Sequence, residues 1–74
     1  MIRLYRDHRG GRWEVILGRE SWGVLVALFV SRDEDDVRQV VLEADSQEEA
    51  GRHLAELDEE GVDELFQRSE PRGD

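Results

Sequence analysis

Asp33, Asp35 and Asp36 lie close together in the sequence and have the side chains of possible calcium ligands. A calcium loop places oxygen ligands at positions 1, 3 and 5, glycine at position 6 and glutamate at position 12. Counted from Asp33, position 5 is Val37 and position 6 is Arg38. We therefore interpret the run as a charged turn and expect no metal site there.

The two histidines, His8 and His53, also lack a ligand pattern. Glu49 and His53 lie four residues apart on a predicted helix and share a face, but no third donor accompanies them. The chain has no cysteine, and no serine has a neighbouring histidine and acid that would activate it as a nucleophile. We expect a protein that is not an enzyme and that carries no cofactor and no metal.

The sequence Arg9-Gly10-Gly11-Arg12 has the residue types of a phosphate cradle. Phosphate loops, however, join a strand to a helix and carry a longer glycine pattern with a lysine and a hydroxyl. Here a second strand-like segment follows instead. We interpret Gly10-Gly11 as a two-residue hairpin turn, because two glycines tolerate positive φ angles.

Arginines and aromatic residues share the first third of the chain, and these types bind phosphates and stack on bases. Residues 1–32 hold six arginines and three acids (+3), whereas residues 33–74 hold four arginines and sixteen acids (−12), which sums to −9. This total repels a polyanion. Nucleic-acid binding is therefore the alternative function, and its predicted residues are Arg6, Arg9, Arg12, Arg19 and Trp22.

Two strands are predicted over residues 2–8 and 12–18. A two-residue turn pairs Arg9 with Arg12 and Tyr5 with Ile16, and a four-residue loop of the same parity keeps the same faces. This register predicts one core face, with Tyr5 and Ile16 on the opposite face. The core-face residues are Ile2, Leu4, Trp13, Val15 and Leu17.

The stretch from Gly23 to Val30 holds eight consecutive uncharged residues and predicts the central strand. Alternation places Val24, Val26, Leu28 and Val30 on one face and Leu25, Ala27 and Phe29 on the other. Both faces therefore need cover. A fourth strand is predicted from Val37 to about Ala44.

The hydrophobic period changes after Asp45. Ser46 and Glu49 match a capping box, so a helix is expected to begin at Gln47. Asp58 is expected to cap a second helix, although one bent helix over residues 47–68 is the alternative. Pro71 and Gly73 predict a frayed end.

Runs of strands followed by helix predict an α+β domain: an antiparallel meander of three to four strands, then one or two C-terminal helices on one face. We expect a single domain over residues 1–70 and a disordered tail over 71–74. Which face the helices cover is left open. The predicted core comprises the central strand and Leu4, Trp13, Val15, Leu17, Val40, Leu42, Ala50, Leu54, Leu57, Leu65 and Phe66.

The helices can cover only one face of a central strand that is apolar on both. We therefore predict a small protein-interaction module that self-associates or joins an assembly through the second face. Its predicted interface residues are Tyr5, Ile16, Trp22, Leu25, Phe29 and Val41. A cytoplasmic location is expected, because the sequence lacks cysteines, a signal-peptide pattern and an apolar segment of about 20 residues.

Overall fold

The computed structural model describes residues 2–72 and has a five-stranded antiparallel sheet with the strands in sequence order. The predicted α+β fold is confirmed, with one strand more than expected. A single turn of 3-10 helix, Ser21–Gly23, links the second and third strands. The other elements are β1 (Ile2–Arg6), β2 (Arg12–Arg19), β3 (Leu25–Ser31), β4 (Val37–Val41), α1 (Gln47–Glu56), α2 (Glu59–Arg68) and β5 (Glu70–Pro71).

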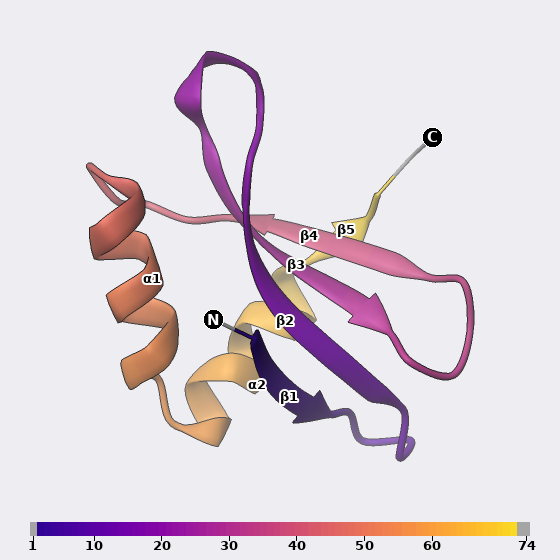
Figure 1. The fold of residues 1–74 in the computed structure, drawn as a ribbon. Coiled ribbons are helices and arrows are strands. Elements are labelled where there is room, and N and C mark those ends of the chain that lie inside the picture. The colour runs from indigo at the N-terminus through magenta and orange to yellow at the C-terminus, as the bar shows by residue number, and fades with distance from the viewer. Residues whose placement is uncertain (1, 73–74) are drawn as a thin grey trace.

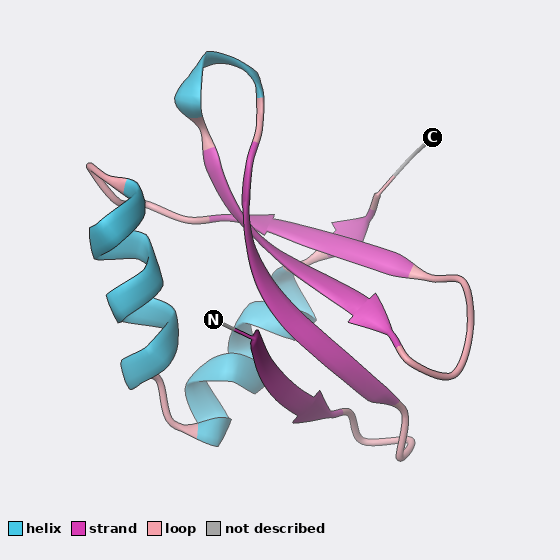
Figure 2. Ribbon diagram, in the orientation of Figure 1, coloured by secondary structure: helices cyan, strands magenta, loops and turns pink. Residues whose placement is uncertain are grey.

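In Figure 1, α2 crosses behind the sheet and α1 lies beside it, at the left. Residues of both helices join one core with the same set of strand residues, so both cover the same face of the sheet. Figure 2 shows that the β2–β3 hairpin, with the helical turn at its tip, extends beyond the rest of the sheet. The core forms between the helices and the sheet, and the rings of Tyr5, Phe29 and Phe66 stack edge-on or tilted within it. Its buried residues are Trp13, Val15, Leu25, Ala27, Phe29, Val40, Leu42, Ala50, Leu54, Val62 and Leu65.

The first hairpin differs from the predicted register. Tyr5 pairs with Trp13 and Leu4 with Glu14, so five residues, 7–11, form the connection. An odd loop length reverses the parity of β1 relative to β2. Tyr5 therefore faces the helices, while Leu4 lies on the other face and is 64% exposed, which makes its predicted place in the core wrong.

The central strand β3 pairs with β2 on one side and β4 on the other. Its two predicted residue sets are confirmed. Leu25, Ala27 and Phe29 point into the core beneath the helices. Alternation then places Val26, Leu28 and Val30 on the face that carries no helix.

The helix boundaries agree with the capping signals. Ser46 accepts the amide of Glu49, and Asp58 accepts the amide of Gly61. Leu57 and Asp58 have extended backbone angles and break the chain into two helices rather than one bent helix.

The C-terminal end differs from the predicted disordered tail. Glu70 and Pro71 pair with Gln39 and Arg38 as β5, and the amide of Arg72 donates to the carbonyl of Val37 at 2.8 Å. The rest of the predicted tail, residues 73–74, lies outside the described residues.

Candidate protein interface

The face of the sheet away from the helices is the candidate site, and we call it the open face. Strand alternation in the observed register defines it. Its apolar residues on β1 to β4 and the preceding turn are Leu4, Ile16, Val24, Val26, Leu28, Val30, Val37 and Val41.

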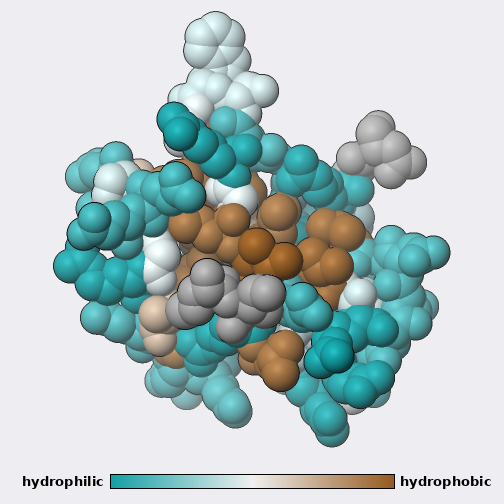
Figure 3. All heavy atoms as spheres, viewed as in Figure 1, coloured by the Kyte–Doolittle hydropathy of each residue, from teal (hydrophilic) through white to brown (hydrophobic). Residues whose placement is uncertain are grey.

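Several of these side chains are exposed. Leu4 is 64%, Val41 55% and Val24 42% exposed. Figure 3 looks onto this face and shows hydrophobic residues gathered over the sheet, with hydrophilic residues around them. A contiguous apolar area with a polar rim is typical of a surface that binds another protein.

Gly18 makes the centre of the open face compact. A Cβ atom at this position would lie 2.9 Å from Cδ1 of Leu28 and 3.1 Å from Cγ2 of Val26. These two side chains therefore occupy the space that a side chain at position 18 would fill. Val26 is 1% exposed.

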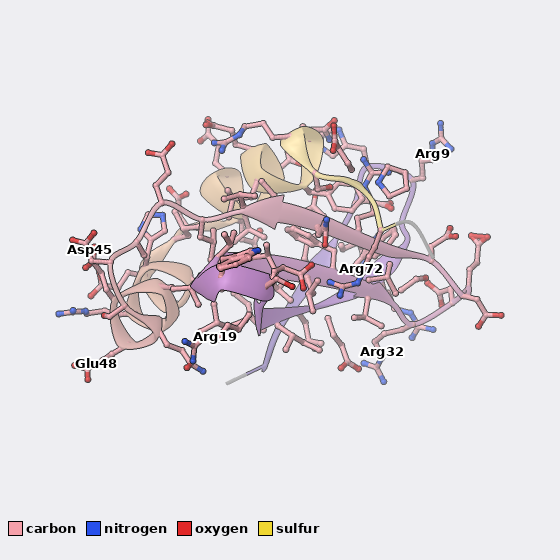
Figure 4. The ribbon with its side chains drawn as sticks, turned by 90° about the horizontal axis from the view of Figure 1, so that it is seen from above. Arg9, Arg19, Arg32, Asp45, Glu48 and Arg72 are labelled. Carbon is pink, nitrogen blue, oxygen red and sulfur yellow. The ribbon has the colours of Figure 1, made fainter. Side chains whose placement is uncertain are left out.

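Ion pairs lie around the apolar residues and also among them, because Glu14 lies between Leu4 and Val30 in the register. Arg12 contacts Asp33 at 2.7 Å, Arg72 contacts Glu20 at 3.0 Å, and Arg32 lies 3.6 Å from Glu14. Figure 4 shows Arg19 and Arg32 on the side of the sheet opposite α2. Each of the three pairs joins one arginine to one acid, so the paired part of the rim carries no net charge.

Trp22 occupies the tip of the β2–β3 hairpin and is fully exposed. Its φ angle is +64°, a left-handed conformation that is rare for an aromatic residue. Trp13, by contrast, is buried in the core, so the predicted difference between the two tryptophans is confirmed. An exposed tryptophan held in an uncommon backbone conformation is a further anchor that a partner could contact.

The structure brings together only part of the predicted interface set. Ile16 and Val41 lie on the open face, and Trp22 lies on the hairpin. Tyr5, Leu25 and Phe29 lie on the helix-covered face instead. Their assignment to the second face is corrected, because the five-residue loop reverses β1 and the helices cover the odd-numbered residues of β3.

The arginines predicted for nucleic-acid binding are dispersed. Arg6 lies on the open face, and Arg12 is neutralised by Asp33. Arg9 and Arg19 lie at opposite corners of the molecule in Figure 4. These arginines do not form one basic surface with Trp22.

The sequence did not predict a cluster of Tyr5, His8 and Asp63. The Tyr5 hydroxyl donates to Oδ1 of Asp63, and Nε2 of His8 lies 3.1 Å from the same oxygen. Burial, followed by the bond to Asp63, raises the pKa of the Tyr5 phenol, while the donated hydrogen bond lowers the pKa of Asp63. No local signal predicts the cluster, because Tyr5 and Asp63 are 58 residues apart.

Within residues 2–72, no three histidine, aspartate or glutamate side chains lie close enough to hold a metal ion. No helix in this part of the chain is long and apolar enough to cross a bilayer. A search of known proteins gave no matching family model, no matching curated protein and no matching solved structure.

Proposed function

We propose that the protein is a non-enzymatic interaction module that binds a second copy of itself through the open face. The exposure of Leu4, Val24 and Val41 on one side of the sheet carries this proposal. Burying apolar area contributes about 25 cal/mol per Å². Among residues 2–72, no element forms a third layer over this face.

The size of the open face supports a dimer. The molecule has principal-axis extents of 33 × 30 × 20 Å, so its broad faces measure 33 × 30 Å. A partner that covers such a face buries about 800 Å² on each side, which is the usual size of a stable interface.

The charge of the rim favours a second copy over a partner of opposite charge. A twofold interface uses the same patch on both subunits, so the patch must complement itself. The pairs Arg12–Asp33, Arg32–Glu14 and Arg72–Glu20 supply both signs in equal number. Two such rims can meet without net repulsion, while the acidic helices stay on the outer sides of the dimer.

Sedimentation equilibrium tests the proposal with Leu4→Ser and Val41→Ser. Each variant removes exposed apolar area from the open face, and we expect the dissociation constant to rise about tenfold or more. Ala55→Ser is the control, because Ala55 is exposed on α1 and lies on the other side of the sheet. A wild-type protein that stays monomeric at high micromolar concentration contradicts the proposal.

The dependence of binding on salt concentration distinguishes this function from nucleic-acid binding. Association through an apolar face with a neutral rim is expected to persist between about 0.1 and 0.5 M salt. Binding to DNA or RNA weakens steeply over the same range. Measurable nucleic-acid binding with this salt dependence, in a protein that remains monomeric, would support the alternative function.

A further inference from the structure

The outer edge of β1 has unpaired backbone groups. The carbonyl of Arg12 accepts the amide of Arg32, so the backbone of Arg12 faces β3 and cannot bond its partner Arg6. The amide of Asp7 donates to Gly11 at 2.9 Å, which fixes the same alternation. Bonded pairs alternate along an antiparallel ladder, so the N–H and C=O groups of Leu4 and Arg6 point away from the sheet.

This edge differs from the opposite edge of the sheet. β5 has only two residues, and one is Pro71, which lacks an N–H group. Proline and short length are features that block the addition of another strand. β1 has five residues and no proline, so it is the edge that can accept one.

A groove of about 320 Å³ runs beside the β1 edge. Its strand side is formed by Arg3, Leu4, Tyr5 and Arg6, with His8 beyond the end of the strand. The first turns of α2 supply Glu59, Glu60, Val62 and Asp63 on the other side. An extended segment in this groove can bond to the strand backbone while its alternate side chains meet the helix.

The cations of the groove lining lie on or after β1: Arg3 donates to the carbonyl of Leu54, and His8 contacts Asp63. Arg6 lies on the open face.

The wall of the groove that α2 forms is acidic. Glu59 and Glu60 are exposed, and neither forms an ion pair with another residue in the described part of the chain. On the opposite side of the edge, Leu4 offers an apolar contact. The preferred segment therefore alternates basic residues, which face α2, with apolar residues, which lie beside Leu4.

We propose that the β1 edge binds an extended peptide of alternating basic and apolar residues, which adds to the sheet as a sixth strand. A second copy of this chain is the competing occupant, because β1 itself places Arg3 between Ile2 and Leu4. It is nevertheless opposed by charge. Pairing β1 with β1 would bring the Glu59 and Glu60 carboxylates of two acidic chains toward one another, and like charges repel. The site adjoins the open face at Leu4 and Arg6. The outward backbone groups of β1 and the carboxylates of α2 take no part in the proposed dimer, so the inference does not rest on the proposed function.

An acetylated and amidated Arg-Val-Arg-Val-Arg-Val peptide tests the site in a titration followed by amide NMR and hydrogen exchange at low salt. The Leu4 and Arg6 amides should shift and exchange more slowly on binding. Arg6→Pro removes an outward N–H and should weaken binding at least about fivefold relative to Arg6→Ala. An Arg-Pro-Arg-Pro-Arg-Pro peptide, which cannot donate from its prolines, should bind more weakly.

Charge reversal gives a second test that does not alter the strand. The double variant Glu59→Lys and Glu60→Lys should weaken peptide binding about fivefold to tenfold. The matched control is Glu48→Lys and Glu49→Lys, the same acidic pair in the first turn of α1, which should change it less than about twofold.

Three results overturn the inference. The first is equal weakening by the two charge reversals, and the second is equal binding of the proline peptide. The third is slower exchange at Leu4 and Arg6 on raising the protein concentration without peptide, which identifies a second copy as the occupant. Because the peptide assay is done on the monomer at low concentration, its failure leaves the dimer through the open face unaffected.

Discussion

The indole N–H of Trp13 donates a 2.9 Å hydrogen bond to Oδ2 of Asp7, from the buried start of β2 to the loop before it. The same carboxylate accepts the backbone amides of Arg9 and Gly11 at 2.9 and 2.7 Å. These three bonds stabilise a five-residue loop at the position where the sequence predicts a two-residue turn. They therefore determine that Tyr5 enters the core and that Leu4 lies on the open face.

Replacing Asp7 tests the role of this loop. Asp7→Ala leaves the Trp13 indole and two amides without their acceptor, so we expect the free energy of unfolding to fall by about 1 to 2 kcal/mol. Asp7→Asn keeps one acceptor oxygen and should lose less. Urea unfolding at neutral pH measures both, and equal stability of the wild type and Asp7→Ala would contradict the role assigned to Asp7.

The conformation of this loop could be predicted only in part from the sequence. Aspartate at the first position of a turn, whose side chain bonds the amide two residues on, is a local signal for the observed loop. The double glycine favours a tighter, two-residue turn. The choice between them depends on Trp13, which supplies a bond only once it is buried.

The helices and the central strand depend on stronger signals. Ser46 and Asp58 cap their helices through bonds to residues three positions on, which are visible in the sequence. The two apolar sets of β3 follow from alternation alone. Which set the helices cover depends on contacts between distant segments, such as those of Phe66 with Tyr5 and Phe29, and these the sequence does not reveal.

Acid should destabilise the fold. Hydrogen bonds from Trp13 to Asp7, from Arg12 to Asp33 and from Tyr5 to Asp63 lower the pKa of each carboxyl below its ordinary value near 3.8. The unfolded chain therefore binds protons more readily than the folded chain. The stability from these bonds is present above pH 3.8 and is lost as the pH falls through the lowered values.

Unfolding by urea at a series of pH values between about 2 and 6 measures this loss, because the carboxyls titrate there. Asp7→Asn removes one of the three groups and should flatten the slope of stability against pH. An unchanged slope in this variant would show that Asp7 ionises alike in the folded and unfolded chains.

The single tyrosine should resist ionisation while the protein is folded. Burial and the bond to Asp63 raise the pKa of Tyr5 above its ordinary value of 10. The stability that this provides is present below pH 10 and is lost as the pH rises beyond it. Ultraviolet absorbance of the phenolate should therefore increase only together with unfolding, whereas titration near pH 10 in the folded state would contradict the contact.

Two helical glycines should respond differently to alanine. A Cβ at Gly51 would meet only Cδ2 of Leu17, at 3.8 Å, so Gly51→Ala should stabilise the protein by about 0.5 to 1 kcal/mol. At Gly61 a Cβ would lie 2.8 Å from Cδ2 of Leu57, which must move. Gly61→Ala should gain less, and thermal unfolding compares the two. Equal gains would show that Leu57 adapts without cost.

Self-association through the open face is the central claim, and contacts between subunits test it most directly. In a sample mixed from carbon-13-labelled and unlabelled chains, filtered NOE spectra detect only methyl groups that meet across an interface. We expect such signals for Leu4, Leu28 and Val41. We expect none for Leu54 on α1 and Val62 on α2, which are buried in the core between the helices and the sheet. Intermolecular signals that are absent, or that come from the helix side of the molecule, would contradict the account.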